Sequence, residues 1–329
     1  MKRIILTFLC IIVFVLSCSN SNAAKEKKIR VAFVPQLIGI PYFTAMETGG
    51  KKAAEKFGGE FLYVGATTAS SAEQVRLIEN LIAQKVDAIS VSVLDQSIDQ
   101  ILEKAKNEGI SVFTSDSDSP NSVREVYVAQ ATDELLGRVL MDRLAAQINN
   151  EGEVGIISGE STAVNLNTWI SWIKKQAEEK YPKIKIVDVR YTLGGSTEDA
   201  LKQAQELMTR YPNIKGLVAV ASTTVPGVAR AVEQAGKIGS VAVIGYGSPE
   251  TVKPYIKSGV MKESVLWNPE DLGYLTFWAG MKIAKGETFE EENIIEGLEK
   301  PVKYFSDTKI LLLGEPLIID ANNVDNFNF

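Results

Sequence analysis

Residues 87–118 read DAISVSVLDQSIDQILEKAKNEGISVFTSDSD. A β-branched run at 87–93 is followed by apolar residues at helical spacing and then by a second β-branched run at 110–114. The helical set is Ile98, Ile101, Leu102 and Ala105. Apolar positions three and four apart form one buried helical face, and continuously apolar strands are typical of parallel sheets covered on both sides. The stretch therefore predicts a strand, a helix and a parallel strand in succession.

The same alternation continues along the rest of the chain. Further β-branched runs lie at 29–34, 60–64, 124–129, 154–158, 184–191, 214–220, 241–246 and 260–266. Ten strands exceed what one twisted open sheet usually carries, so we expect two sheets of about five strands each. The predicted fold class is α/β, with two doubly wound parallel-sheet lobes joined by a multi-segment hinge.

Composition excludes several classes of chemistry. The chain has 329 residues, 35 Lys and Arg against 41 Asp and Glu, and a formal net charge of -6. A chain with this excess of acidic residues is not expected to present a basic surface that binds nucleic acid. The chain has no His, and its cysteines are Cys10 and Cys18 alone, so His-dependent nucleophilic sites, the usual His-bearing zinc sites and a disulfide framework are not expected. It also lacks a G-x-x-x-x-G-K-[ST] phosphate loop.

The first residues have the layout of an export signal. Lys2 and Arg3 precede an apolar run at 4–16, which is too short for a comfortable membrane span. The sequence Val-Leu-Ser-Cys at 15–18 resembles a bacterial lipobox, which predicts a lipoprotein signal peptide at 1–17, a lipid anchor on Cys18 and a tether over 18–28. The alternative is ordinary cleavage after Ala23, which leaves Cys18 in the discarded peptide. In either case we expect export.

Polar and aromatic residues gather where predicted strands end. In doubly wound domains, ligands bind beyond the carboxyl ends of the strands. Those ends here are 35–43, 94–95, 115–118, 159–167, 221–224, 246–248 and 267–268. Two such rims facing each other predict a polar cleft with aromatic walls.

Four segments carry a resemblance to a known family. They are Pro41-Tyr42-Phe43 before a helix, the strand entry at 84–89, the strand end at 110–118 and the segment 257–269. Over its whole mature length the chain resembles type I periplasmic sugar-binding proteins, the ribose-binding-protein superfamily. The resemblance implies the periplasmic binding protein type I fold. It also implies a first lobe at 29–130 plus 268–299, a second lobe at 131–267 plus 300–329, and crossings near 130, 267 and 300.

Within that superfamily the chain is most similar to the branch of rhamnose-binding and autoinducer-2-binding proteins. The Pro-x-Leu-x-Gly pattern at 35–39, Trp169 and the segment 266–269 indicate this branch. The autoinducer-2 type has Lys where this chain has Gln36, an Asp-Gln pair at 165–166 and Pro at Val220, so autoinducer-2 is the weaker option. The ribose type also differs, with Arg at Asn165 and Asp at Gly247.

The resemblance and the strand ends together select eight candidate ligand-binding residues. The Asp116 carboxylate can accept two hydroxyl groups at once. Phe43 and Trp267 can pack on the C–H face of a sugar ring, with core packing as their alternative role. The amides of Gln36, Asn165 and Asn268 can both donate and accept, with turns or helix starts as the alternative. The remaining two are Asp95 and Ser222, for which helix capping is the main rival.

The implied function is that of a lipid-anchored, monomeric solute receptor in the periplasm or on the outer face of the cytoplasmic membrane. It would bind a small neutral sugar, a rhamnose-like deoxyhexose or a pentose, by hinge closure and serve a carbohydrate ABC importer whose permease and ATPase are separate chains. No catalysis, cofactor or metal is expected. The alternative ligand is autoinducer-2, for uptake or for presentation to a sensor kinase.

Two rivals come from other classes of protein. A LacI-type repressor shares the fold but begins with a DNA-binding module, where this chain has an export signal. A secreted glycoside hydrolase needs two acids about 5–10 Å apart, and only Asp116 has a persuasive position in the cleft.

Overall fold

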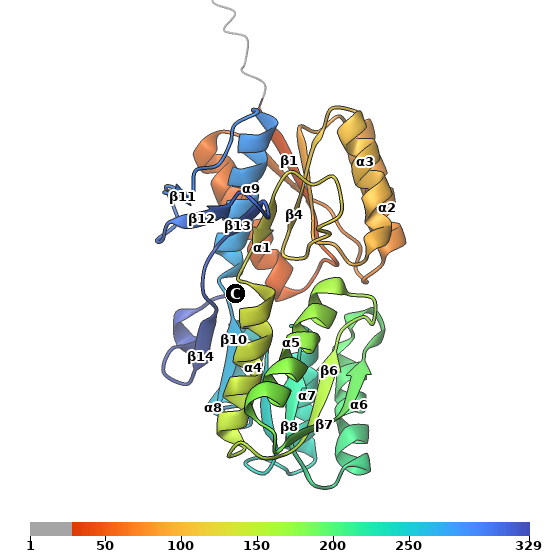
Figure 1. Ribbon diagram of the computed structural model, residues 1–329, viewed down its shortest axis with the longest axis vertical. Coiled ribbons are helices and arrows are strands. Elements are labelled where there is room, and N and C mark those ends of the chain that lie inside the picture. The colour runs from red at the N-terminus through yellow and green to blue at the C-terminus, as the bar shows by residue number, and fades with distance from the viewer. Residues whose placement is uncertain (1–27) are drawn as a thin grey trace, which may run out of the picture.

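The computed structural model describes residues 28–329, which form two α/β lobes, one above the other in Figure 1. The predicted signal peptide, Cys18 and almost all of the predicted tether lie outside the described residues. Each lobe has a central sheet with helices packed on its faces. The fold class is the α/β architecture with parallel sheets expected from the sequence.

The first lobe is built on the five parallel strands that the sequence predicts. Their spatial order is β5, β4, β3, β1, β2, and each neighbouring pair is parallel. Residues of β1 alternate between two cores, because successive side chains of a strand point to opposite faces. Phe33 packs toward one core and Val34 toward the other. The strands are β1 (Arg30–Val34), β2 (Glu60–Tyr63), β3 (Ala88–Val91), β4 (Ser111–Ser115) and β5 (Tyr127–Ala129).

Three short strands extend this sheet and correct a predicted boundary. Beyond β5 lie β13 (Ile310–Leu312), β12 (Val302–Phe305) and β11 (Glu292–Asn293), with β13 parallel to β5 and the other two pairings antiparallel. Residues 302–312 therefore belong to the first sheet, whereas the prediction placed everything after 300 in the second lobe. These strands have two to four residues, too few for a periodic pattern, and they form because β5 offers an open edge.

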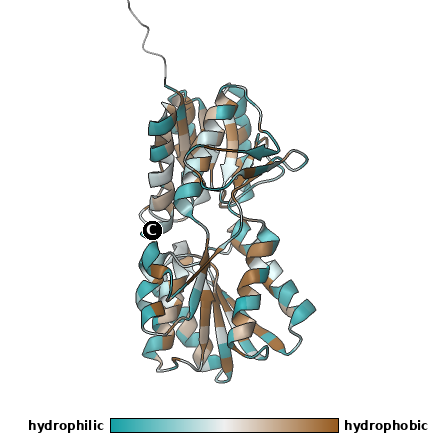
Figure 2. Ribbon diagram, turned by 90° about the vertical axis from the view of Figure 1, so that its left-hand side faces the viewer, coloured by the Kyte–Doolittle hydropathy of each residue, from teal (hydrophilic) through white to brown (hydrophobic). Residues whose placement is uncertain are grey.

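The second lobe has a four-stranded parallel sheet and a separate two-stranded ribbon. The sheet order is β7, β6, β8, β9, from β6 (Gly152–Ser158), β7 (Ile184–Tyr191), β8 (Ile214–Ala219) and β9 (Ala242–Gly245). The run predicted as a fifth parallel strand forms β10 (Glu263–Leu266), which lies beside β9 but pairs antiparallel with β14 (Leu317–Asp320). The partner is the returning C-terminal chain, which strand propensity alone does not reveal. Figure 2 shows hydrophobic colour along the strands of this lobe and hydrophilic colour on the outer helices.

Helices cover both faces of each main sheet. In the first lobe α1 and α9 pack together on one face and α2 and α3 on the other. In the second lobe α4 packs with α5 and α6 packs with α7. The helices are α1 (Pro41–Phe57), α2 (Ser71–Ala83), α3 (Asp99–Asn107), α4 (Asp133–Gln147), α5 (Val164–Lys180), α6 (Thr197–Arg210), α7 (Thr224–Gln234), α8 (Pro249–Lys257) and α9 (Pro269–Ala284), with short 3-10 turns at Gln96–Ile98, Leu193–Gly195 and Val324–Asn326.

Two glycines set the closeness of α1 and α9. A Cβ on Gly49 would lie 1.8 Å from the carbonyl oxygen of Glu270, and a Cβ on Gly273 would lie 1.9 Å from that of Met46. The two backbones can approach this closely only because neither position carries a side chain. This contact holds the first turn of α9 against α1. It thereby also positions residues 267–268, which directly precede α9.

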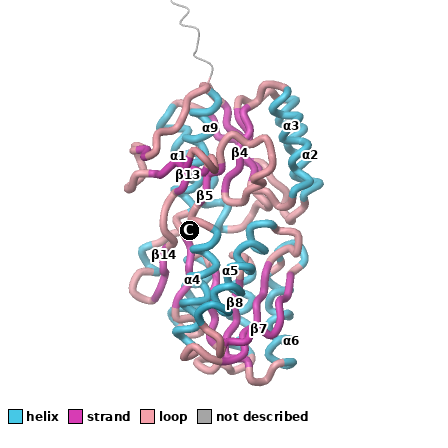
Figure 3. Tube along the Cα trace, viewed as in Figure 1, coloured by secondary structure: helices cyan, strands magenta, loops and turns pink. Residues whose placement is uncertain are grey.

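The chain crosses between the lobes three times, always in loops. The crossings are residues 130–132 between β5 and α4, 267–268 between β10 and α9, and 313–316 between β13 and β14 (Figure 3). The first two agree with the predicted positions, whereas the third lies after β13 and not near residue 300. The second crossing carries Trp267 into the space between the lobes.

Candidate functional site

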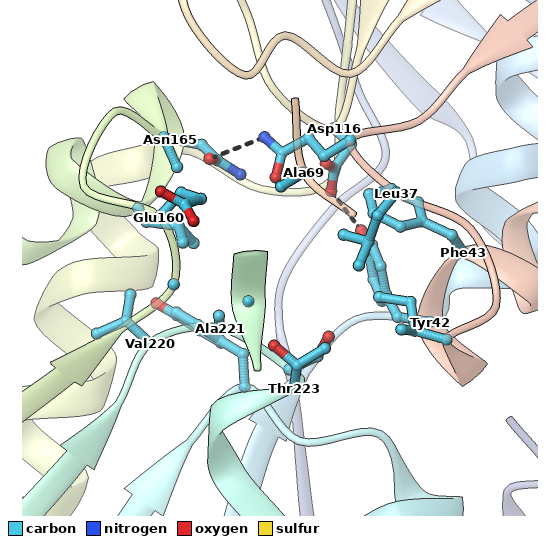
Figure 4. A pocket seen from close by; sticks show the side chains of 18 of the residues that line it. Leu37, Tyr42, Phe43, Ala69, Asp116, Glu160, Asn165, Val220, Ala221 and Thr223 are labelled. Atoms are coloured by element: carbon cyan, nitrogen blue, oxygen red, sulfur yellow. Dashed lines mark hydrogen bonds between the residues drawn. The ribbon is translucent and has the colours of Figure 1, made fainter. Parts of the chain in front are cut away.

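A pocket lies between the two lobes, at the carboxyl ends of strands from both sheets (Figure 4). It contains about 600 Å³ of empty space, part of it open to solvent. The lining comes from the loops after all the strands from β1 to β4 and from β6 to β10, and from the first halves of α1 and α5. The residues are Gln36, Leu37, Ile40, Tyr42, Phe43, Ala69, Leu94, Asp116, Gly159, Glu160, Ala163, Asn165, Leu166, Trp169, Gly195, Val220, Ala221, Ser222, Thr223, Tyr246, Leu266 and Trp267.

Asp116 supplies a buried carboxylate on the first-lobe side. It directly follows β4 with a φ of 71°, a left-handed conformation that Asp tolerates better than most residues. Its side chain is buried, and its two carboxylate oxygens accept hydrogen bonds from the Tyr42 hydroxyl at 2.5 Å and the Ser92 hydroxyl at 2.6 Å. Two protein hydroxyls thus occupy the acceptor positions that the sequence analysis reserved for ligand. Each carboxylate oxygen keeps one further lone pair for a ligand hydroxyl.

Burial also changes the acidity of this carboxyl. It raises the pKa of Asp116 from 3.8 to about 6, because removal from water disfavours the charged form. The hydrogen bonds from Ser92 and Tyr42 lower the pKa, and the charge of Asp133 raises it, but both effects are smaller than that of burial. At neutral pH Asp116 is therefore predominantly an acceptor-only carboxylate.

Five aromatic side chains form one wall of the pocket, called here the aromatic wall: Tyr42, Phe43, Trp169, Tyr246 and Trp267. The Trp267 ring lies centrally, with centroids 5.7 Å from Tyr42, 5.9 Å from Trp169 and 5.7 Å from Tyr246. Its indole Nε1 donates to the Tyr42 hydroxyl at 3.0 Å. A hydrogen-bond chain therefore runs from Trp267 through Tyr42 to Asp116, and it fixes the first-lobe side of the wall.

Local sequence explains why these rings converge. Pro41 occupies the first turn of α1, where its missing N–H costs nothing, and places Tyr42 and Phe43 at the helix start that faces the second lobe. Trp169 projects from the first half of α5, and its Nε1 donates to Asp133 at 2.7 Å. The remaining two aromatics directly follow β9 and β10.

Hydrogen bonds join the lobes across the pocket. Gln36 Nε2 donates to the Val93 carbonyl at 3.0 Å in its own lobe and to Asn165 Oδ1 at 3.3 Å in the other, the contact drawn in Figure 4. Beside it, the backbone N–H of Val164 donates to the Leu94 carbonyl at 3.2 Å. These contacts hold the two rims together.

The charge of the lining is one-sided. Asp116 and Glu160 are its ionisable acids, and none of the lining residues in the described chain is Lys or Arg. The rest is mostly apolar or aromatic, with amide and hydroxyl groups between. Such a lining suits a ligand that offers hydroxyl donors and an apolar face, and it disfavours an anion. Within residues 28–329 there is no group of three or more side chains able to hold a metal ion.

The structure brings together six of the eight predicted site residues. Gln36, Phe43, Asp116, Asn165, Ser222 and Trp267 all line the pocket. Asp95 and Asn268 do not line it and serve as helix caps. The Asp95 carboxylate accepts from the Ser97 N–H at 2.9 Å and from the Ser71 hydroxyl, and Asn268 Oδ1 accepts from the Glu270 N–H at 3.0 Å. A polar side chain just before a helix accepts hydrogen bonds from the free N–H groups of the first helical turn, and both Asp95 and Asn268 have this role.

Sequence reasoning missed other lining residues. Tyr42 lies inside the segment Pro41-Tyr42-Phe43 and Tyr246 within the strand end 246–248, but neither was selected as a candidate. Glu160, within the strand end 159–167, was not selected either, and Trp169 was used only to indicate the branch of the family. For the two tyrosines the available signal was a hydroxyl-bearing aromatic next to a strand end. That signal does not distinguish core from cleft without the tertiary structure.

Comparisons with known proteins agree with this architecture. A family model described as a periplasmic binding protein domain matches residues 31–288. The D-ribose/D-allose-binding protein of Pseudomonas aeruginosa is 25% identical over 307 residues, which cover 89% of this chain and 95% of that protein.

Two solved structures are similar at the level of the whole chain. LsrB from Clostridium saccharobutylicum in complex with AI-2 has a TM-score of 0.85 at 26% identity, covering 92% of this chain and 100% of that one. An ABC transporter solute-binding protein from Clostridium phytofermentas with bound L-rhamnose has a TM-score of 0.84 at 26% identity, covering 91% of this chain and 98% of that one. In the described part of the chain, no helix is both long and apolar enough to cross a membrane.

Proposed function

Because the chain belongs to the periplasmic binding protein family, we propose that it is an extracytoplasmic receptor that binds a small neutral sugar between its lobes for a carbohydrate ABC importer. The ligands named for two similar proteins, D-ribose or D-allose for one and L-rhamnose for the other, support this class of ligand. A rhamnose-like deoxyhexose or a pentose suits the lining best. Such sugars pair a few hydroxyls with an apolar face, as the pocket does.

The observation that carries the proposal is the two-sided pocket. Gln36 and Asp116 come from the first lobe and Asn165 comes from the second, so one ligand can contact both lobes only when they are close together. A ligand that binds only the closed form shifts the hinge equilibrium toward it. Moving that equilibrium from 1:99 to 99:1 takes about 5.5 kcal/mol of differential binding. The closed shape is then the signal that the membrane permease reads.

The remaining parts of the proposal concern partners and location. The permease and the ATPase are separate chains, the receptor acts as a monomer without cofactor or catalysis, and a lipid on Cys18 holds it at the outer face of the cytoplasmic membrane or in the periplasm. Support comes from the lipobox-like sequence before Cys18 and from the absence of a phosphate-loop motif in the sequence.

A thermal-shift screen tests the ligand class. Deoxyhexoses, pentoses, hexoses and polyols are added to the purified protein, and a tight ligand raises the Tm because it binds only the folded state. We expect a neutral deoxyhexose or pentose to give the largest shift, and its phosphorylated counterpart to give none. No shift with any sugar, or turnover of an added glycoside, contradicts the proposal.

A second candidate ligand is autoinducer-2, supported by the structural similarity to LsrB in complex with AI-2. The differences at Gln36, Asn165 and Val220 noted above argue against it. Adding autoinducer-2 to the same screen separates the two candidates. If autoinducer-2 raises the Tm and no sugar does, autoinducer-2 becomes the favoured ligand.

A further inference from the structure

The hydroxyl of Tyr246 is buried in the wall of the pocket. The residue follows β9 at the carboxyl edge of the second-lobe sheet, lines the pocket and is 1% exposed. Among residues 28–329 its hydroxyl has no hydrogen-bond partner. Buried tyrosine hydroxyls usually find a partner, because leaving one unpaired is costly. An unpaired hydroxyl in the wall of a binding pocket therefore indicates a partner on the ligand.

The ring that carries this hydroxyl is fixed. It packs edge-on against Trp169, with centroids 4.9 Å apart at 67°, and at a tilt of 53° against Trp267. The neighbouring Gly247 adds no side chain, and a Cβ there would lie 2.2 Å from Val252 Cγ1. Burial, with a smaller contribution from the charge of Asp133, holds the pKa of Tyr246 well above 10, so the hydroxyl stays a neutral donor.

Several other polar groups of the lining already have a hydrogen-bond partner within the protein. Tyr42, whose ring also packs against Trp267, donates to Asp116 and accepts from the indole. In the second lobe, Asn165 Oδ1 accepts from Gln36 and the Glu160 carboxylate accepts from the Gly194 N–H. Both tyrosines pack against Trp267, but the Tyr42 hydroxyl donates one hydrogen bond and accepts another, whereas that of Tyr246 has no partner among the described residues.

We propose that Tyr246 is a specificity-determining residue of the second lobe, whose hydroxyl forms a hydrogen bond with an oxygen of the bound sugar. This inference rests on the proposed function. A sugar that lacks an oxygen at that position leaves the hydroxyl unpaired and binds more weakly, so Tyr246 selects among sugars of similar size.

Calorimetric titration of wild type and Tyr246→Phe with L-rhamnose, D-ribose, D-allose and D-arabinose tests the assignment. For the sugar that wild type binds most tightly, we expect roughly tenfold weaker binding by the variant, because one buried hydrogen bond is lost. The Tm without sugar should stay unchanged or rise, since the variant removes an unpaired polar group from the interior. A purely structural role would instead lower the Tm.

Tyr63→Phe is the matched control. Its hydroxyl is also buried and without a partner in the described chain, but the residue does not line the pocket. Its sugar affinity should equal that of wild type. Equal affinities of wild type and Tyr246→Phe, or equal losses in both variants, overturn the inference and leave the receptor function standing. If wild type binds none of the four sugars, the sugar-receptor function falls and the assignment of Tyr246 falls with it.

Discussion

Gln36 Nε2 donates a hydrogen bond of 3.3 Å to Oδ1 of Asn165, which lies 129 residues later in the chain and in the other lobe. Both side chains are buried, and both line the same pocket. This side-chain contact joins the two lobes inside the pocket. The same two residues can therefore take part both in ligand binding and in closure of the lobes. The first prediction follows from it.

Asn165→Ala should weaken sugar binding about tenfold and shift the unliganded protein toward an open form, because the variant loses a ligand contact and a cross-lobe hydrogen bond. Calorimetry measures the affinity, and the radius of gyration from solution scattering measures the opening. Asn167→Ala is the control, since that amide bonds only within its own lobe, to Ser161 and Tyr191. An unchanged affinity for Asn165→Ala contradicts the assignment.

Asp116→Asn should gain stability relative to wild type as the pH rises. The folded-state pKa of Asp116, about 6, lies above the ordinary value of 3.8, so between these values the native state holds the proton and the unfolded chain has lost it. Wild-type stability from this group is present below about pH 4 and is lost as the pH approaches 6. The loss is about 3 kcal/mol, and a neutral amide avoids it. Asn also tolerates the left-handed backbone at this position.

Urea unfolding of both proteins between pH 4 and 7.5 measures that difference. Asp307→Asn, at an exposed position outside the pocket, is the matched control for replacing a carboxylate by an amide. Parallel stability curves for wild type and Asp116→Asn rule out the raised pKa.

Gly49→Ala should destabilise the first lobe by about 1–3 kcal/mol or more, since its Cβ meets the Glu270 backbone and α1 must move away from α9. Urea unfolding monitored by circular dichroism gives the free energy. Glu55→Ala, at an exposed position on the same helix, should change stability by less than about 0.5 kcal/mol. A Gly49→Ala protein as stable as the control refutes the close contact.

Cys18→Ala should abolish incorporation of labelled palmitate and release the protein from the membrane fraction, because the proposed lipid anchor is attached at this residue. Cys10→Ala should remain labelled, since Cys10 lies inside the predicted signal peptide. Mass spectrometry of the mature protein provides a second measurement. A mature chain that begins at Ala24 shows ordinary cleavage instead.

Much of the fold could be predicted from local pattern. All ten β-branched runs form strands, and the helical face with Ile98, Ile101, Leu102 and Ala105 is buried as expected. The last four strands could not be predicted in this way. They have two to four residues each and exist because an edge of the first sheet and β10 were open for pairing.

The site divides in the same manner. Strand ends together with the family resemblance were enough to select Asp116, Gln36 and Asn165, because the carboxyl ends of parallel strands share one edge of a sheet. They could not separate Asn268, which caps α9, from Trp267 beside it, which lines the pocket.

Periodicity was enough to predict two α/β lobes and the edge of each sheet where ligand-facing residues gather. Composition was enough to predict acidic chemistry without His. Both are properties of the chain that can be counted without knowing how it packs. Only the tertiary structure decided the partners of the C-terminal strands, the engagement of Asp116 by Tyr42 and Ser92, and the isolation of the Tyr246 hydroxyl. Each of these depends on which surfaces meet when distant segments pack. The residues adjacent in sequence do not indicate which distant segments will be in contact.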